Sequence, residues 1–331
     1  MKIIIDAFGG DNAPKSAIEG AVLAAKEYDA DIVLAGESGV IHKCADENGI
    51  DLAGIEILEA DGVISMHDDP GLILKSKKDC SMGVGLQSLA ADSADAFVSA
   101  GSTGALLMGG TFIVKRIKGI KRPALGAIVP SVNGCFMLVD CGANAEARPE
   151  MLVQFARMGA AYMSLVVGVD NPRVGLVNNG AEETKGTDML RETYRLLKED
   201  HSINFIGNIE GRDAPLGQCD VAVADGFVGN VMLKTMEGMG KALYTKIKGV
   251  FLKNAISKLA ALTVSGGLKE FKKSMDSSEY GGAPLLGLEK PVIKAHGNSD
   301  ATAIKNAVRQ AISCCNADVC GNIRKGITDE H

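Results

Sequence analysis

Short apolar segments alternate with longer amphipathic segments along almost the whole chain, and this alternation constrains the fold more than any other feature. The apolar segments are three to six residues long, and most show no strict polar alternation, which is typical of strands covered on both faces. They lie at residues 2–6, 31–35, 56–59, 96–99, 124–129, 135–140, 173–177, 204–207, 221–224 and 292–294.

The segments between these strands have helical character. They span residues 14–27, 38–48, 80–93, 104–116, 149–167, 186–199, 229–247 and 300–319. Strand–helix alternation predicts right-handed crossovers and a mostly parallel sheet with helices on both faces, which is a three-layer α/β/α fold. No Ser/Gly linker divides the sequence, so residues 1–331 are expected to form a single α/β domain.

Composition excludes several classes of protein. The net charge is −6 and there is no Trp, which argues against a nucleic-acid-binding surface. No apolar stretch approaches 18 residues, and the run Ile3–Ile5 is too short for the core of a signal peptide. None of the eight cysteines forms a Cys-x-x-Cys pair. We therefore expect a cytoplasmic protein with reduced thiols and no transmembrane helix.

Clusters of Gly, Asn, Ser and Asp follow several of the expected strands. In an open parallel sheet ligands bind beyond the carboxyl ends of the strands, where glycine lets backbone N–H groups approach an anion. A single loop of this kind is better explained as a turn or helix cap, but several together predict a shared anion site. The clusters are Asp6–Pro14, Ser99–Ala105, Asp140–Asn144, Ala224–Asn230, Tyr280–Pro284 and His296–Ser299.

The common alternatives fail on spacing. The sequence contains no Gly-x-x-x-x-Gly-Lys-Ser/Thr, which argues against a P-loop nucleotidase, and the Gly9-Gly10 loop lacks the Gly-x-Gly-x-x-Gly dinucleotide pattern. It contains no Gly-x-Ser-x-Gly elbow of a serine hydrolase and no His-Glu-x-x-His metal motif.

In combination, the motifs resemble the phosphate acyltransferase family of bacterial phospholipid synthesis, whose members make acyl phosphate from acyl-acyl carrier protein and inorganic phosphate. The resemblance implies a fold like those of isopropylmalate dehydrogenase and phosphotransacetylase, a homodimer and no cofactor. The matching segments follow the family order through nearly the whole chain: Asp6–Pro14, Ser99–Ala105, Glu182–Gly186, Asp225–Asn230, Tyr280–Gly287 and His296–Ser299.

The implied reaction is attack by a phosphate oxygen on a thioester carbonyl. Phosphate is a nucleophile near pH 7 and a thiolate is a competent leaving group, so the reaction requires no covalent enzyme intermediate and no metal. The protein must hold phosphate, align it and stabilise the tetrahedral oxyanion.

Position within the family motifs makes Lys185 and Asn230 the candidate catalytic residues. Lys185 lies just before an expected helix, where its charge and the helix dipole act on the same anion. The Asn230 amide either donates to the oxyanion or phosphate, or caps a helix.

The remaining site candidates are expected to line the substrate or phosphate pocket. Asp6 and Asp225 either orient the catalytic pair or have a buried structural partner, and His296 either donates to substrate or is structural. His67 is interpreted as part of a turn. The predicted pocket residues are Asp6, Gly9, Gly10, Ser102, Thr103, Gly104, Asp225, Gly229 and His296.

A basic segment interrupts this otherwise acidic chain. Residues 241–273 contain eight lysines and one glutamate, a net charge of +7. Residues 247–276 are predicted to form an amphipathic helical hairpin that turns at Gly266-Gly267. An apolar face flanked by Lys suits an anionic membrane surface, and the alternatives are a dimer contact or attraction of the acidic carrier protein. The expected contact residues are Phe251, Leu252, Lys253, Ile256, Lys258, Leu259 and Leu262.

Three other functions compete with long-chain acyl transfer from a carrier protein. A phosphotransacetylase-like enzyme that uses acyl coenzyme A would need the same loops, but a small acetyl product would not explain the basic hairpin. A dehydrogenase of the isopropylmalate type would need an Asp metal cluster and nicotinamide contacts, neither of which is evident. A non-enzymatic phosphate- or lipid-binding scaffold would bind the same ligands but would show no turnover, so an activity measurement distinguishes it from the enzyme.

Overall fold

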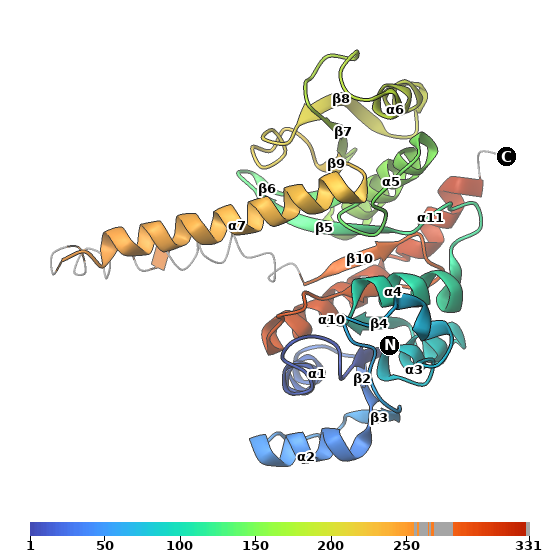
Figure 1. Cartoon of the computed structure of the whole chain (residues 1–331), viewed down its shortest axis with the longest axis vertical. Helices are drawn as coiled ribbons and strands as arrows, with labels where there is room; N and C mark the ends of the chain where they lie inside the picture. Colours follow the sequence, from blue (N-terminus) through green and yellow to red (C-terminus); the bar gives the residue numbers. More distant parts are fainter. Residues whose placement is uncertain (255–256, 258–263, 265, 268–280, 329–331) are drawn as a thin grey trace.

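Eleven strands form one sheet in the computed structural model, which describes residues 1–254, 257, 264, 266–267 and 281–328 (Figure 1). The strand order is β3-β2-β1-β4-β11-β10-β5-β6-β9-β7-β8. The strands are β1 (Lys2–Asp6), β2 (Asp31–Gly36), β3 (Glu56–Glu59), β4 (Ala96–Ser99), β5 (Ala124–Ser131), β6 (Gly134–Val139), β7 (Arg173–Asn178), β8 (Asn204–Glu210), β9 (Val221–Val223), β10 (Ala283–Leu286) and β11 (Val292–Lys294).

Helices cover both faces of this sheet, which confirms the predicted three layers. Side chains alternate across β1, so Ile3 and Ile5 enter one hydrophobic cluster and Ile4 enters the other. The first cluster lies under α1 (Lys15–Glu27), α2 (Ser38–Asn48), α5 (Pro149–Tyr162), α6 (Asp188–Glu199), α10 (Ala301–Asn316) and α11 (Val319–Thr328). The second lies under η1 (Pro70–Leu74), α3 (Ser81–Ala90), α4 (Thr103–Gly109) and part of α7 (Gly226–Phe251).

Short π-helical turns extend two of the helices. Residues Gly110–Lys115 (η2) continue α4, and Met163–Val167 (η3) continue α5. The predicted helices at 104–116 and 149–167 therefore correspond to these composite elements. The 3-10 helix η1 begins three residues after His67, at the turn predicted there, and its N-cap Asp69 accepts a hydrogen bond from the N–H of Gly71 at 2.7 Å.

The sheet is mostly parallel, but its two halves run in opposite directions. β10 pairs antiparallel with both β11 and β5, and β5 pairs antiparallel with β6. β6, β9, β7 and β8 are therefore directed against β1, β2, β3, β4 and β11. The prediction that the glycine-rich loops share one end of adjacent strands is confirmed for the loops after β1, β4 and β11, which are parallel neighbours. It is wrong for the loops after β6 and β9, because three consecutive antiparallel pairings reverse the strand direction between β11 and β6. Strand β10 was not predicted, because the residues Gly281–Pro284 at its start favour a loop.

Helix α7 extends well beyond the body of the molecule (Figure 1). It runs unbroken from Gly226 to Phe251, so the predicted helical hairpin from residue 247 begins within α7. Val264 lies in a turn, whereas Gly266 and Gly267 are helical, so the turn predicted at the glycine pair is wrong. Glycine permits a turn without requiring one.

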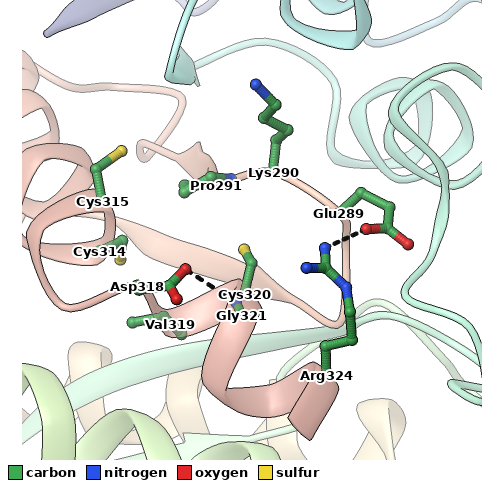
Figure 2. A pocket seen from close by; sticks show the side chains of 10 residues that line it. All are labelled: Glu289, Lys290, Pro291, Cys314, Cys315, Asp318, Val319, Cys320, Gly321 and Arg324. Carbon is green, nitrogen blue, oxygen red and sulfur yellow. Dashed lines mark hydrogen bonds and ion pairs between the residues drawn. The ribbon is translucent and has the colours of Figure 1, made fainter. Parts of the chain in front are cut away.

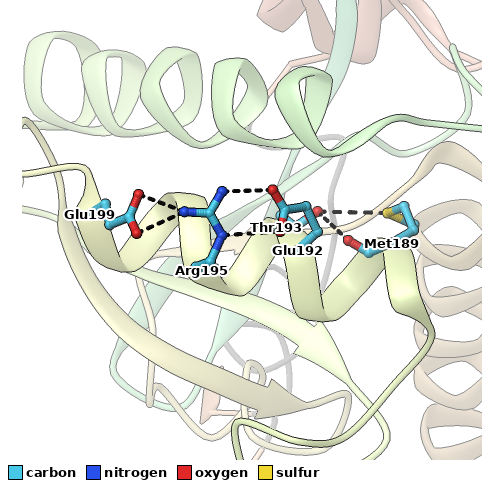
Figure 3. A network of polar contacts seen from close by, with 5 residues as sticks. All are labelled: Met189, Glu192, Thr193, Arg195 and Glu199. Carbon is cyan, nitrogen blue, oxygen red and sulfur yellow. Dashed lines mark hydrogen bonds and ion pairs between the residues drawn. The ribbon is translucent and has the colours of Figure 1, made fainter.

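The outer face of α6 carries a row of solvent-exposed ion pairs. Arg195 pairs with Glu192 and Glu199, each at 2.8 Å, at helical spacings of three and four residues (Figure 3). Thr193 donates a hydrogen bond to the carbonyl of Met189 at 2.8 Å on the buried side (Figure 3). This polar network supports an amphipathic helix and contains none of the predicted site residues.

Candidate active site

The loops after β1 and β4 pack tightly over a buried carboxyl group. The Asp6 carboxylate accepts hydrogen bonds from the Ser99 hydroxyl at 2.7 Å and from the N–H of Phe8 at 3.2 Å. Burial raises the pKa of Asp6, and hydrogen bonds from Ser81 and Ser99 oppose this rise. A Cβ on Gly9 would lie 2.6 Å from both Asp6 Oδ2 and the Gly101 nitrogen, so only glycine allows this approach. Asp6 therefore has a structural partner.

The loop after β11 joins this cluster. The N–H of Asp11 donates to the carbonyl of Gly297 at 2.7 Å. Gly10 has a φ of +100°, and a Cβ there would lie 2.9 Å from the Gly297 oxygen. The structure thus brings together the predicted loops that contain Gly9, Gly10 and His296.

Lys294, at the end of β11, lies beneath these loops and was missed by the sequence analysis. Its side chain is buried, and its ammonium donates to the carbonyls of Ala100, at 3.2 Å, and Ala295. Burial lowers the pKa of Lys294 to about 8, although the nearby Asp6 charge raises it. No motif marked this lysine, because its strand reads as a short apolar segment.

The next predicted residues form the start of α4. The Ser102 hydroxyl accepts from the N–H of Ala105 at 3.4 Å and so caps the helix. Thr103 is the first residue of the helix, and Gly104 lies against the Pro70 ring, where a Cβ would be 2.8 Å from Pro70 Cγ. Ser102 and Gly104 therefore have structural functions in addition to any contact with phosphate.

A second cluster forms where α7 begins, beside the loop after β6. The buried Asp140 carboxylate accepts hydrogen bonds from the N–H groups of Leu125 at 3.0 Å and Asn144 at 2.6 Å. Burial raises the pKa of Asp140, and the hydrogen bonds from this loop lower it. The carbonyl of Asn144 accepts from the N–H of Gly226 at 2.7 Å, so the loop holds the first residue of α7.

Two glycines allow this close approach. A Cβ on Gly226 would lie 2.6 Å from the Asn144 oxygen, and one on Gly229 would overlap the carbonyl oxygen of Asp140. The Asp225 side chain caps α7 by accepting from the N–H of Val228 at 2.8 Å. The predicted phosphate-binding residues Asp225 and Gly229 therefore also fix the position of α7.

Asn230 lies on the first turns of α7 and is exposed. The alternative that it caps the helix is wrong, because Asp225 occupies that position. Its side chain lies close to Gly142 in the loop after β6, where an added Cβ would be 3.8 Å from Asn230 Oδ1. In the described part of the chain its amide makes no hydrogen bond, so it can donate to an oxyanion.

Lys185 is exposed in the loop between β7 and α6. The Lys185 N–H donates to the carbonyl of Glu182 at 3.1 Å, and its own carbonyl accepts from Asn178 at 3.3 Å. Thr187, rather than Lys185, caps α6. Among the described residues, no hydrogen bond or ion pair joins the Lys185 ammonium to Asn230 or to the loops around Asp6.

Helix α7 connects the two clusters. After Asn230 it passes the loop that follows β11, and the Lys234 ammonium lies 3.1 Å from His296 Nε2. Glu237 lies one turn further along and pairs with Lys234 at 2.9 Å. Partial burial and the Lys234 charge lower the pKa of His296. A signal for Lys234 was present in the sequence, because it follows Asn230 by four residues on an expected helix.

A separate cavity lies between the β10–β11 connection and the junction of α10 with α11 (Figure 2). Its volume is about 210 Å³, and Arg324 pairs with Glu289 at its rim. All eight cysteines of the chain are unpaired, and burial raises the pKa of Cys315, in this cavity, to about 11. No predicted site residue lines this cavity. In the described ranges, no group of three or more His, Cys, Asp or Glu side chains is placed to hold a metal ion.

Comparison with known proteins identifies relatives that span the whole chain. The model of a family described as fatty acid synthesis proteins matches residues 1–322. A phosphate acyltransferase of Alkaliphilus oremlandii is 47% identical over 328 residues, which cover 99% of this chain and 98% of that relative. A phosphate acyltransferase of Clostridioides difficile is 45% identical over 329 residues, which cover 99% of this chain and 96% of that relative.

The fold is also found in solved structures of more distant sequence. A phosphotransacetylase from Streptococcus pyogenes superimposes with a TM-score of 0.65 at 16% identity, covering 96% of this chain and 94% of that protein. The EutD phosphotransacetylase from Staphylococcus aureus gives a TM-score of 0.60 at 17% identity, with the same coverage. These likenesses confirm the expected phosphotransacetylase-like fold.

Proposed function

The chain belongs to the phosphate acyltransferase family, and we propose that it transfers a fatty acyl group from acyl-acyl carrier protein to inorganic phosphate. The product is an acyl phosphate for phospholipid synthesis. The observation that carries this proposal is the near-complete alignment with phosphate acyltransferases at 45–47% identity. The phosphotransacetylase-like fold supports it, since the named chemistry of those proteins is also acyl transfer involving phosphate.

The reaction needs a held anion and a stabilised oxyanion more than it needs a protein nucleophile. Asn230 supplies a free amide beside the loop after β6. Lys185 supplies an exposed cation in the loop after β7, a strand that pairs with β9. We assign hydrogen-bond donation to the phosphate or to the oxyanion to Asn230 and charge compensation to Lys185, while the loops at Gly9, Gly10 and Ser102–Gly104 line the substrate site.

The two enzymatic alternatives differ in the acyl donor, which is either acyl-acyl carrier protein or acyl coenzyme A. One described surface suits an acidic carrier protein, since residues 115–122 contain five basic side chains and no acidic one. Lys115, Arg116 and Lys118 line a depression of about 300 Å³ together with Phe112, which is 59% exposed. A basic surface with an exposed aromatic side chain attracts an acidic partner and offers it an apolar contact. Acyl coenzyme A, the alternative donor, is also anionic, so the two donors are distinguished by comparing their rates of turnover.

The protruding part of α7 supports the proposal of contact with an anionic membrane surface, whereas the proposal of a homodimer rests on the family alone. Val250 is 66% exposed and Leu252 is 51% exposed, next to the exposed Lys253. Phe251 is partly exposed, whereas the predicted contact residues Ile256, Lys258, Leu259 and Leu262 lie outside the described residues. No helix in the described ranges is long and apolar enough to cross a membrane. We propose a cytoplasmic protein that binds the membrane peripherally.

Trapping the product with hydroxylamine tests this function. The protein is incubated with palmitoyl-acyl carrier protein and phosphate, and acyl hydroxamate is measured, with palmitoyl coenzyme A as the comparison donor. We expect hydroxamate that depends on phosphate and forms faster from the carrier protein. Preference for coenzyme A would favour the alternative, and formation that is independent of phosphate would overturn the proposal.

A further inference from the structure

Three polar side chains from two separate elements meet at one point along α7. Lys234 and Glu237 come from the helix, and His296 comes from the loop after β11. The Lys234 ammonium lies 2.9 Å from Glu237 Oε2 and 3.1 Å from His296 Nε2, while His296 Nε2 and Glu237 Oε2 are 3.8 Å apart. The ammonium is therefore held from two sides.

This arrangement leaves one donor of the ammonium without a described partner. An ammonium has three N–H donors and no acceptor, so the Nε2 atom of His296 accepts and its ring proton lies on Nδ1. Glu237 accepts from a second N–H. The Lys234 side chain is 51% exposed, whereas that of Glu237 is 20% exposed. The third N–H can therefore reach a ligand from solvent.

Asn230 precedes Lys234 by four residues, and side chains at this spacing lie on one face of a helix about one turn apart. The free Asn230 amide and the third Lys234 N–H are thus neighbouring donors. Two donors about 5–6 Å apart at their Cβ atoms suit an anion with several oxygens.

A second cation lies behind this face. The charge of Lys234 helps to lower the pKa of Lys294, and the charges of both lysines help to lower the pKa of His296. The two ammonium groups therefore repel each other in the free protein, while His296 is neutral. An oxyanion bound between the two ammonium groups would relieve this repulsion, because an opposite charge stabilises both of them.

We propose that Lys234 and Asn230 bind the phosphate nucleophile as a pair, with Glu237 and His296 as positioning residues that hold the Lys234 ammonium. This inference rests on the proposed function and specifies its acceptor site. Hydrogen phosphate attacks the thioester carbonyl carbon, so a C–O bond forms and the C–S bond breaks. The proton of hydrogen phosphate ends on the departing thiolate, giving acyl phosphate and free thiol.

The position of Lys234 in the fold differs from that of Lys185, the other candidate cation. Lys185 lies beyond β9 in the loop after β7, and its hydrogen bonds in the described ranges are to Glu182 in that loop and to Asn178 at the end of β7. Lys234 shares a helix face with Asn230 and touches the β11 loop. Phosphate held by Lys234 would lie between the two glycine-rich clusters that α7 joins.

The test compares Lys234→Met, Lys234→Arg and Glu237→Gln with the wild-type full chain. Lys43→Met is the matched control, since Lys43 is an exposed helical lysine on α2 at the far edge of the sheet. The KM for phosphate and the KM for acyl-acyl carrier protein are measured separately. We expect Lys234→Met to raise the phosphate KM at least tenfold while the acyl-donor KM stays within about twofold. Lys234→Arg should restore most of the phosphate affinity, and Glu237→Gln should give a smaller increase.

A binding measurement separates failure of this inference from failure of the proposed function. Inorganic phosphate should raise the Tm of the wild type and of Lys43→Met but not that of Lys234→Met, whether or not any acyl donor is turned over. If Lys234→Met keeps both the wild-type phosphate KM and the phosphate-induced Tm shift, the inference is wrong. If the wild type makes no acyl phosphate, the proposed function fails, and the Tm series still decides whether Lys234 binds phosphate.

Discussion

Replacing Gly226 with Ala tests whether the loop after β6 positions α7. The new Cβ would lie 2.6 Å from the Asn144 oxygen and 2.8 Å from Asp140 Oδ2, whereas ordinary contact begins near 3.4 Å. The start of the helix must therefore retreat by about 0.8 Å. The same movement would stretch the 2.7 Å hydrogen bond from Gly226 to Asn144 to about 3.5 Å, which breaks it.

The energetic and catalytic costs of this movement can be estimated. Overpacking of this kind costs roughly 1–3 kcal/mol of unfolding free energy. Asn230 and Lys234 move with the helix, and a misplacement of about 1 Å can lower a rate roughly 100-fold. We therefore expect Gly226→Ala to be less stable by roughly 1–3 kcal/mol and to lose most of its kcat/KM for acyl phosphate formation.

Two further glycines on α7 turn this prediction into a series. Gly229→Ala should be more damaging, because its Cβ overlaps the Asp140 carbonyl oxygen. Gly238→Ala is the control, since nothing lies within 4 Å of its Cβ, and it should gain up to about 1 kcal/mol of helix propensity. Urea unfolding followed by circular dichroism gives stability, and hydroxamate formation gives activity. Equal stability and activity of Gly226→Ala and Gly238→Ala would refute the reasoning.

Four further predictions follow from the structure. Burial lowers the pKa of Lys294 to about 8 from 10.5, so the folded chain loses this proton first and the contribution of Lys294 to the unfolding free energy should rise by about 3 kcal/mol between these pH values. In urea unfolding, the free energy of the wild type minus that of Lys294→Met should therefore rise by this amount from pH 8 to pH 10.5, and a constant difference would contradict it. Lys185→Ala should fold normally and lose turnover in the hydroxamate assay, so a near-normal rate would remove Lys185 from the mechanism. Leu252→Glu should weaken flotation with anionic liposomes, while Leu216→Glu, at a leucine 58% exposed elsewhere, should not; equal flotation of the two variants would argue against membrane contact at α7. Lys118 lines the basic depression, so Lys118→Glu should raise the KM for acyl-acyl carrier protein and leave the phosphate KM unchanged. An unaltered KM for acyl-acyl carrier protein would show that the depression does not bind the carrier.

Much of the fold could be predicted because local pattern and burial agree. The run Ile3–Ile5 is apolar on consecutive positions, and both faces of β1 are buried. The other strands that were predicted are short apolar segments of the same kind. β10 was missed because Gly281, Gly282 and Pro284 favour a loop locally. Its strand conformation depends on pairing with the neighbouring β11 and with β5, which is distant in sequence.

The candidate site was predictable only in part for the same reason. Glycine-rich motifs marked Gly9, Gly10 and Gly229, but sequence alone did not show that Gly229 lets α7 approach Asp140. Lys234 could be selected from its spacing to Asn230, but its contact with His296 and the burial of Lys294 against Ala100 appear only in the structure. Contacts of this kind join segments that are distant in sequence, so no local pattern marks them.

The most direct test of the proposed function is the stoichiometry of the reaction. Purified protein is incubated with palmitoyl-acyl carrier protein and radiolabelled phosphate, and free carrier thiol is measured together with label in an organic-soluble product that hydroxylamine destroys. Acyl transfer to phosphate predicts one labelled phosphate incorporated for each thiol released. Release of thiol without incorporation of label would show that water accepts the acyl group and would contradict the assignment of phosphate as the acceptor.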